Sequence, residues 1–320
     1  MRILYIECAM GAAGDMLMGA LSELIDDADE FVSHMNGMGL KGVKVEREQA
    51  TRCGIVGTHM RVLIDGLEEL EHDHDEAHEH IADAGHEHEH DHEHDHGHEH
   101  DHEHEHDHGH DHGHDHGHDH GHDHEHGHDH GHNHEHGHAH NHHHEHAHHH
   151  IHTALPDVAA AIDALAIAPE VKRRADEAYA LIAQAEAHAH GRPVEQVHFH
   201  EVGAADAIAD VVGVCELIER IAPDRIVVSP INLGSGMTRC AHGMVPVPAP
   251  ATAYILRGVP VYGSAIRGEL CTPTGAALLR MLADDFGPMP LMRIEAIGYG
   301  CGTKEFPAAN CVRAYLGEAE

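Results

Sequence analysis

The stretch Arg2-Ile-Leu-Tyr-Ile-Glu7, followed by Cys8-Ala-Met-Gly-Ala-Ala-Gly14 and then Asp15-Met-Leu-Met-Gly-Ala-Leu21, decides the fold class. The apolar run that ends at Glu7 predicts a buried strand, and a loop of small residues follows it. From Asp15 to about residue 25, apolar side chains recur at helical spacing. A strand, a loop and a helix in this order predict an α/β or α+β domain.

Strand-like and helix-like segments continue to alternate along the rest of the chain. A mixed sheet with packed helices is therefore the expected architecture, although the residue pattern does not give the strand order. The expected further strands are 43–48, 55–64, 225–229, 259–262, 291–299 and 310–316, with a short extended segment at 197–200. The expected further helices are 156–166, 169–190, 205–221, 251–256 and 273–282.

A histidine-rich tract, residues 67–152, interrupts this pattern. It holds 26 of the 56 Asp and Glu residues and 40 of the 47 His residues, and almost no apolar side chains. A segment that cannot bury apolar surface is predicted to be disordered. The expected organisation is thus residues 1–66 and 153–320 as two parts of one folded α/β region, with the tract 67–152 between them as a long His/Asp/Glu-rich insertion.

The composition of the tract indicates metal binding. Imidazole alternates with carboxylate or glycine over most of its length, which offers many equivalent weak sites; examples are His98, His110, His120 and His130. An inert acidic linker is the alternative, but a linker does not need His at every second position. Ligand chemistry alone favours copper and then nickel or zinc, so the tract predicts metal handling without identifying the metal.

The net charge excludes some classes of partner. The total is −37, of which −11 remains when the tract is left out. An acidic surface repels nucleic acids and anionic membranes, so neither is an expected partner. No apolar run reaches the ~18 residues of a transmembrane helix, and the first residues do not resemble a signal peptide. We therefore expect a cytoplasmic protein, and a homo-oligomer remains open.

The seven cysteines form no Cys-x-x-Cys pair. Their scattered spacing is not typical of a disulfide framework or of a zinc ribbon.

Four residues around a glycine turn form the candidate metal site. In an extended segment His198 and His200 point to the same side, and Asp206 and Asp210 share one helix face. A turn at Gly203 would bring the two pairs together. The alternative is that Asp206 only complements the helix N-terminus while Asp210 is solvated. His242 in Cys240-Ala-His242 is a further candidate ligand, although an ordinary loop explains that motif equally well.

Two loops carry residues suited to an anionic substrate. Ser235 lies in the loop Asn232-Leu-Gly-Ser-Gly236, which follows a predicted strand, and Arg239 comes just after this loop. Such a loop could cradle a phosphate. Near Glu269, a helix start holds Thr272, Thr274 and Gly275, where free backbone N–H groups favour anions. Plain helix capping is the alternative for this second loop, and for either loop taken alone the structural interpretation is the favoured one.

The local context of Asp15, His188 and His190 indicates other roles for these residues. Asp15 follows a loop that lacks the Lys of a phosphate-binding loop and would repel phosphate, so a metal, hydroxyl or capping role suits it better. His188 and His190 close a predicted helix and are expected to complement its dipole.

Five longer motifs together resemble the LarC family of nickel-insertion proteins. They are CAMGAAGDMLMGAL, VHFHEVGAADAIADVVG, SPINLGSGMTRCAHGMVPVPAPAT, GELCTPTGAALL and IGYGCGTKEFPAANCVR, and a His-rich insertion before the second is typical of the family. The resemblance implies insertion of nickel into pyridinium-3,5-bisthiocarboxylic acid mononucleotide. The product is the nickel-pincer cofactor of lactate racemase and related enzymes, with one nickel–carbon and two nickel–sulfur bonds.

The resemblance also implies CTP hydrolysis assisted by Mn²⁺ or Mg²⁺. Family members carry the CTP site in a further C-terminal domain, so the chain resembles their N-terminal portion. A separately encoded C-terminal partner is the expectation that follows, together with weak or no CTP binding by this chain alone. The catalytic roles of Asp15, His200, Glu201 and Glu269 are inferred from their chemistry and not from the family.

Two functions remain after these arguments. The first is a nickel insertase, a lyase-class metal chelatase, or its nickel-delivering half. The second is a non-catalytic nickel storage protein or metallochaperone. The tract supports both functions equally, whereas two anion-suited loops beside a His/Asp cluster favour the first.

Overall fold

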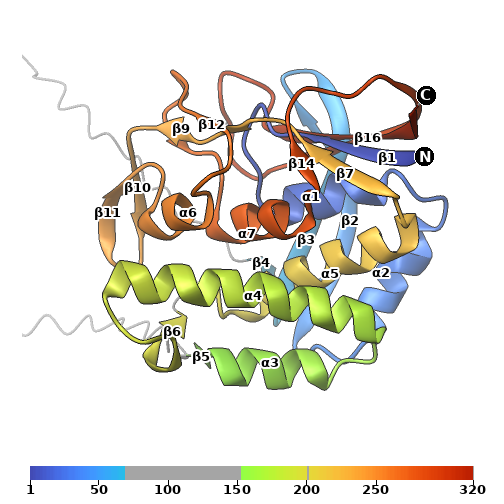
Figure 1. The fold of residues 1–320 in the computed structure, drawn as a ribbon. Helices are drawn as coiled ribbons and strands as arrows, with labels where there is room; N and C mark the ends of the chain where they lie inside the picture. Colours follow the sequence, from blue (N-terminus) through green and yellow to red (C-terminus); the bar gives the residue numbers. More distant parts are fainter. Residues whose placement is uncertain (69–152, 200–201, 320) are drawn as a thin grey trace, which may run out of the picture. The chain divides into compact units, whose positions relative to one another are not determined.

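One mixed sheet gathers strands from both sides of the histidine-rich tract (Figure 1). The computed structural model describes residues 1–68, 153–199 and 202–319. The strand order is β14-β7-β1-β16-β15-β3-β2, and β4 pairs with β3. The strands of this sheet are β1 (Arg2–Glu7), β2 (Val43–Arg52), β3 (Ile55–Ile64), β4 (Leu67–Glu68), β7 (Arg225–Val228), β14 (Asp285–Phe286), β15 (Met292–Cys301) and β16 (Cys311–Ala319).

The strand pairing joins segments from both flanks of the tract in one sheet. β1 lies parallel to β7 and antiparallel to β16, so the first strand of the chain is joined to strands more than 200 residues later. β15 runs antiparallel to β16 and meets β3 through the single pair Gly300 and Thr58. β2 and β3 form an antiparallel hairpin at the sheet edge. The predicted mixed α/β class is confirmed.

In the described residues, four small two-stranded pairings stand outside the main sheet. These pairings fix the positions of loops that carry several of the candidate site residues. The pairs are β5 (Thr153–Ala154) with β6 (His198–Phe199), β8 (Ile231–Asn232) with β12 (Val261–Tyr262), β9 (Gly234–Ser235) with β13 (Gly268–Glu269), and β10 (Met237–Cys240) with β11 (Gly243–Pro246).

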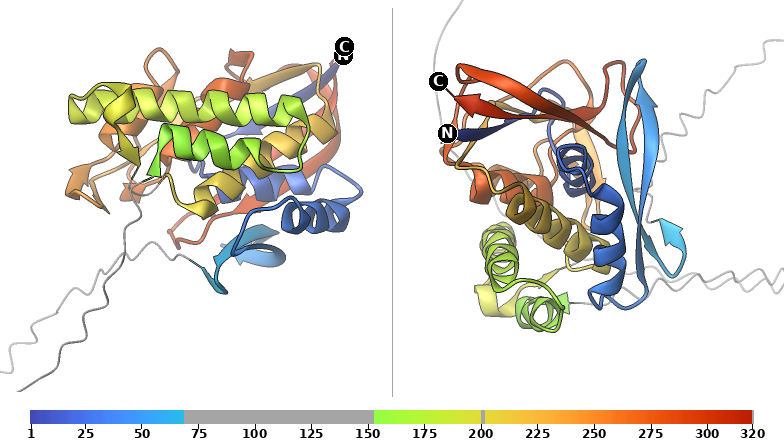
Figure 2. Two further views of the ribbon diagram at one scale, coloured as in Figure 1. Left: turned by 90° about the horizontal axis from the view of Figure 1, so that it is seen from below. Right: turned by 90° about the vertical axis from the view of Figure 1, so that its right-hand side faces the viewer.

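The helices lie on one side of β1, β15 and β16 (Figure 2). α1 packs on β3 and β15 and also on α5, while α4 packs on α5, α6 and α7. The core between these layers is apolar, with Leu4, Leu17 and Val212 fully buried. The helices are α1 (Gly14–Ser22), α2 (Ala28–Gly37), α3 (Leu155–Asp163), α4 (Pro169–His190), α5 (Ala205–Ile221), α6 (Pro250–Ile255) and α7 (Pro273–Leu282), with a 3₁₀ turn η1 (Val194–Gln196).

Local signals in the chain determine where the longer helices begin and end. α4 starts at Pro169, which lacks a backbone N–H, but the first turn of a helix has no partner for that N–H. The helix ends at His190, and the next residue, Gly191, caps it with a left-handed φ of 60°. α7 starts after Thr272, whose side chain accepts a hydrogen bond from the backbone N–H of Gly275. The bounds of α4, α5 and α7 are those predicted from the sequence.

Other elements differ from expectation. α1 ends at Ser22 and not near residue 25, because the chain turns there and the backbone N–H of Leu24 bonds to the carbonyl of Leu21. Helix α2 was not expected; its polar sequence buries only Ala28, Phe31 and Met35. The hairpin β10–β11 was also not expected.

Two further predictions concern the predicted disorder of the tract and membrane-spanning segments. The tract predicted to be disordered is residues 67–152; its first two residues, Leu67 and Glu68, form β4 and pair with β3. The prediction for residues 69–152 lies outside the described residues. Within the described residues, no helix is long and apolar enough to cross a membrane.

Candidate functional site

The loop between β1 and α1 is held on both sides by main-chain hydrogen bonds. On one side, the carbonyl of Cys8 accepts the backbone N–H of Asn232, whose side-chain amide donates to the carbonyl of Ala9. On the other, Ala12 donates to the carbonyl of Leu270 and accepts from Thr272. A Cβ at Gly11, which has a φ of 71°, would overlap the carbonyl of Leu270. The loop therefore needs glycine there and presents the start of α1 in one fixed position.

Asp210 of α5 lies against the N-terminus of α1. A Cβ on Gly14 would come within 2.6 Å of its Cβ and of Oδ2, so a glycine at the helix start lets the carboxylate approach. The backbone N–H of Asp15 donates to this carboxylate. Oδ1 of Asp210 is buried and has no hydrogen-bond partner among the described residues. The predicted alternative, a solvated Asp210, therefore does not describe this side chain.

Asp15 and Asp206 place two further carboxylates beside Asp210. Burial raises the pKa of Asp210 well above its usual value, the charges of Asp15 and Asp206 raise it further, and the hydrogen bond from Asp15 opposes the shift. Asp206 lies one helical turn before Asp210 on α5, as the spacing predicts. Three carboxylates thus converge where the N-termini of α1 and α5 meet.

A tyrosine and a histidine that the sequence analysis did not select lie next to this carboxylate group. Burial, and then the charges of Asp206 and Asp210, raise the pKa of Tyr179 well above its usual value. Its hydroxyl is buried without a partner among the described residues. His59 of β3 is buried, with Nδ1 2.9 Å from the carbonyl oxygen of Cys301 and 3.9 Å from Oδ2 of Asp15. A carbonyl only accepts, so Nδ1 carries the proton.

The predicted histidine half of the metal site is only partly described. His198 is exposed on β6, whereas its neighbour Phe199 is buried with its ring centre 6.0 Å from that of Tyr179. The turn at Gly203 is present, and it packs so closely on Phe199 that a Cβ would come within 2.6 Å. His200 and Glu201 lie outside the described residues, as do His98, His110, His120 and His130. Among the described residues, no three or more His, Cys, Asp or Glu form a group that could hold a metal ion.

The two anion-suited loops are brought close to each other. β13 pairs with β9, so Glu269 lies opposite Gly234 and one residue from Ser235 in register. The hydroxyl of Ser235 donates to the carbonyl of Ile266. Thr272 caps α7, and a Cβ on Gly275 would overlap the carbonyl of Ala12. Both residues therefore have structural roles, and Thr274 is buried. Arg239 is exposed on β10.

His242 was predicted as a ligand and lies at the turn of the β10–β11 hairpin. Its ring centre is 4.7 Å from that of His190, the last residue of α4. Cys240, the other half of the Cys-x-His motif, directs its thiol to the carbonyl of Gly243 within its own hairpin.

A family sequence profile described as "Nickel insertion protein" matches residues 4–320. The chain belongs to this nickel-insertion family. Three of its relatives are a "Putative nickel insertion protein" of Dictyoglomus thermophilum and two proteins named "Pyridinium-3,5-bisthiocarboxylic acid mononucleotide nickel insertion protein", of Geobacillus kaustophilus and Desulfitobacterium hafniense.

The extent of these matches differs. The Dictyoglomus protein is 32% identical to this chain, and the match covers 99% of this chain and 61% of the relative. The Geobacillus protein is 33% identical, and the match covers 99% of this chain and 60% of the relative. The Desulfitobacterium protein is 45% identical over 51% of this chain and 41% of its own length. This nickel-insertion family member therefore spans about 60% of the length of the two relatives that match it throughout. No solved structure matches it.

Sequence reasoning missed His59, Tyr179 and His190 as neighbours of the candidate residues in this family member. His59 stands between Thr58 and Met60, which are both buried, and a histidine within a buried strand is the one local signal that could have selected it. Tyr179 and His190 have no such signal, because only packing against α5 or the hairpin shows what they face.

Proposed function

We propose that this protein inserts nickel into pyridinium-3,5-bisthiocarboxylic acid mononucleotide to form the nickel-pincer nucleotide cofactor. Family membership over residues 4–320 supports nickel insertion as the general function. The printed names of the Geobacillus and Desulfitobacterium relatives support the choice of mononucleotide. The single structural observation that carries the proposal is the convergence of Asp15, Asp206 and Asp210 at the start of α1.

The chemistry of insertion explains why carboxylates are useful at this place. Nickel replaces the hydrogen on one ring carbon and binds two thiocarboxylate sulfurs, so one proton must leave the ring. Asp15, whose side chain is 21% exposed beside buried His59, is the proposed proton acceptor. Asp206, Asp210, His198 and His200 are the proposed ligands that hold nickel before transfer, with Glu201 and Glu269 as further catalytic candidates. Carboxylate and imidazole together suit nickel.

The proposed phosphate position is the loop region formed by β9, β13 and the start of α7. Arg239 supplies positive charge from β10, and Ser235, Thr272, Thr274 and Gly275 come from segments held together by the β9–β13 pairing and the contact with Ala12. Because Thr272 already caps the Gly275 N–H, the phosphate would rely on Arg239 and hydroxyl groups more than on a free helix end.

We also propose that insertion consumes CTP with Mn²⁺ or Mg²⁺, bound in a region of the longer relatives that this chain does not cover. An activity assay should therefore include a separately produced C-terminal domain of a family member. The mixture contains this protein, nickel, the thiolated mononucleotide and CTP, with and without that domain, and mass spectrometry detects the nickelated product. Nickel binding without any nickelated product under all these conditions would favour the storage or metallochaperone function.

Variants connect this assay with the site. His200→Ala and Asp206→Asn should abolish product formation while leaving bulk nickel binding almost intact, because the tract keeps its 40 histidines. Thr272→Ala should weaken mononucleotide binding more than nickel binding. The matched control is Asp29→Asn, which changes an exposed aspartate of α2. Normal product formation by the His200 and Asp206 variants would show that the working site lies elsewhere.

A further inference from the structure

Two cysteines stand directly opposite each other at the last register position of the β15–β16 ladder. They are Cys301, the final residue of β15, and Cys311, the first residue of β16. The scattered cysteines of the sequence do not indicate a disulfide framework, and all seven thiols are free in the structure. The strand pairing nevertheless places these two positions, ten residues apart in the chain, next to each other.

The backbone hydrogen bonds show which kind of antiparallel pair this is. The N–H of Gly302, one step beyond the pair, donates to the carbonyl of Asn310. The N–H of Cys311 donates to the carbonyl of Ala309, two residues earlier in the chain, and not across the ladder. Cys301 and Cys311 therefore form a non-hydrogen-bonded pair, the closer of the two kinds, in which the Cα atoms are about 4.5 Å apart. Disulfides join Cα atoms that are roughly 4.4–6.8 Å apart, so this pair lies within the range.

The two thiols also share one face of the sheet, because directly opposite residues of an antiparallel pair point to the same side. Burial, and then the charge of Cys301, raise the pKa of Cys311 to about 11, in agreement with neighbouring sulfurs. Gly57 of β3 leaves room for them, since a Cβ there would come within 3.0 Å of Sγ of Cys301. A bond between the two sulfurs therefore requires no movement of the strands.

The thiol pair adjoins the carboxylate group at the start of α1. The carbonyl of Cys301 accepts the hydrogen bond from Nδ1 of His59 at 2.9 Å, and that nitrogen is 3.9 Å from Oδ2 of Asp15. Burial raises the pKa of the Cys301 thiol, and the charge of Asp15 adds to this rise. A change at the thiol of Cys301 is therefore made within electrostatic reach of the candidate site.

We propose that Cys301 and Cys311 form a reversible disulfide and thus provide a modification site for small-molecule disulfides beside the carboxylate group. Cys311 is 7% exposed and Cys301 is fully buried, so Cys311 reacts first, when the end of the ladder opens. Its thiolate attacks one sulfur of the small disulfide, which gives a mixed disulfide and releases one small thiolate.

The thiolate of Cys301 then attacks the sulfur of Cys311 and releases the second small thiolate. Two electrons pass from the cysteine pair to the small disulfide, and the two cysteine protons end on the two released thiols. An excess of small thiol reverses both steps. The bond forms without nickel or the mononucleotide, so this inference does not depend on the proposed function.

A thiol–disulfide titration of the full chain tests the site. The protein is equilibrated with a chelator in mixtures of reduced and oxidised glutathione, over a long period because thiols with a raised pKa react slowly. It is then quenched with acid, alkylated in denaturant and digested with trypsin. Each of the seven cysteines falls in its own tryptic peptide, because Lys304 separates Cys301 from Cys311 and a Lys or Arg separates all the others.

Mass spectrometry should find peptides 294–304 and 305–313 joined, in protein whose intact mass is that of one chain. The joined fraction should rise with the proportion of oxidised glutathione and disappear with excess thiol. The oxidised protein should also unfold at a higher temperature than the reduced protein, because a cross-link restricts the unfolded chain. Cys301→Ala and Cys311→Ala should each remove the joined peptides and this difference in unfolding temperature.

The matched control is Cys53→Ala. Cys53 is exposed at the turn between β2 and β3, and its charge also acts on Cys311, so it is the competing partner that the titration must exclude. This variant should give as much of the joined peptides as the unchanged protein does. Separate alkylation of Cys301 and Cys311 over the whole titration, or a bond from Cys311 to Cys53 in place of Cys301, overturns the inference. Both results are read from the unchanged chain, so they do not depend on the folding of a variant.

Discussion

At the scale of single residues, the carboxylate of Asp210 in the candidate site is expected to reduce the stability of the fold at neutral pH. Its carboxylate is placed beside two others, and burial together with their charges raises its pKa. A group whose pKa is raised by folding stabilises the protein below its unfolded pKa, about 3.9 for Asp, and loses that contribution as the pH rises through the folded value. At neutral pH the ionised form of Asp210 is therefore unfavourable for folding.

Asp210→Asn should accordingly stabilise the protein at neutral pH. The amide oxygen can still accept the N–H of Asp15, while the repulsion from Asp15 and Asp206 is removed. We expect a higher unfolding midpoint than that of the unchanged protein at pH 7, measured by thermal denaturation with a chelator present, and a difference that shrinks as the pH is lowered toward about 4. A lower midpoint for the variant at pH 7 would contradict this electrostatic account.

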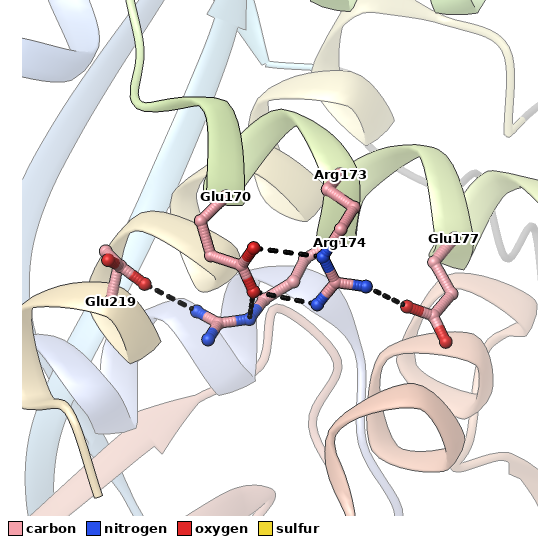
Figure 3. A network of polar contacts seen from close by, with 5 residues as sticks. All are labelled: Glu170, Arg173, Arg174, Glu177 and Glu219. Atoms are coloured by element: carbon pink, nitrogen blue, oxygen red, sulfur yellow. Dashed lines mark hydrogen bonds and ion pairs between the residues drawn. The ribbon is translucent and has the colours of Figure 1, made fainter.

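At the scale of elements, charged residues join α4 to α5 and also run along α4 (Figure 3). Arg174 of α4 bonds to Glu219 of α5 at 3.0 Å, and it also lies 3.4 Å from Glu170 on its own helix. Within the part of the chain that the structure describes, Arg173 bonds only to two residues of α4, Glu170 and Glu177. Arg174 is thus the member of the network that connects two helices.

Arg174→Ala should lower the unfolding midpoint slightly, and Arg173→Ala should change it less. The side chain of Arg174 is 22% exposed, whereas that of Arg173 is 59% exposed and its ion pairs are screened by solvent. Thermal denaturation at low and high salt measures both effects, and high salt should reduce the difference between Arg174→Ala and the unchanged protein. A larger effect for Arg173→Ala would mean that the pairs within α4 matter more than the bridge to α5.

At the scale of the whole molecule, the described sheet is complete without residues 71–150. β3 and β2 come from before it, β15 and β16 from after it, and the sheet joins them directly. Deleting residues 71–150 should therefore leave the unfolding midpoint nearly unchanged while removing most of the bound nickel. Calorimetry and metal analysis of the two proteins test this, and a large loss of folded structure would contradict it.

The nickel capacity of the full chain should also depend on pH. An imidazole must be neutral to bind metal, so capacity should fall as the pH drops through about 6.5, the unperturbed pKa of histidine. Equilibrium dialysis between pH 5 and pH 8 gives the measurement, with the tract-deleted protein as the control. A constant capacity across that range would argue against imidazole ligands.

Signals that lie within a few residues were sufficient to predict several elements from the sequence. Pro169 and Gly191 bound α4, and Thr272 with Pro273 begins α7, because capping and backbone restriction act within one helical turn. The long motifs likewise sufficed for the family, since they carry their information in consecutive residues. Helix α2 was missed because its ten residues hold few apolar side chains and depend on packing for their stability.

The sequence by itself determined the α/β class, the bounds of α4, α5 and α7, the nickel-insertion family and the pairing of Asp206 with Asp210 on one helix face. Only the tertiary structure decided that Asp210 meets Gly14 and Asp15, that Tyr179 and His59 adjoin this group, and that His190 faces His242. The reason is physical. Helix periodicity and capping act over a few residues, whereas contacts between α1 and α5, or between α4 and the hairpin, join positions that come together only when the core packs.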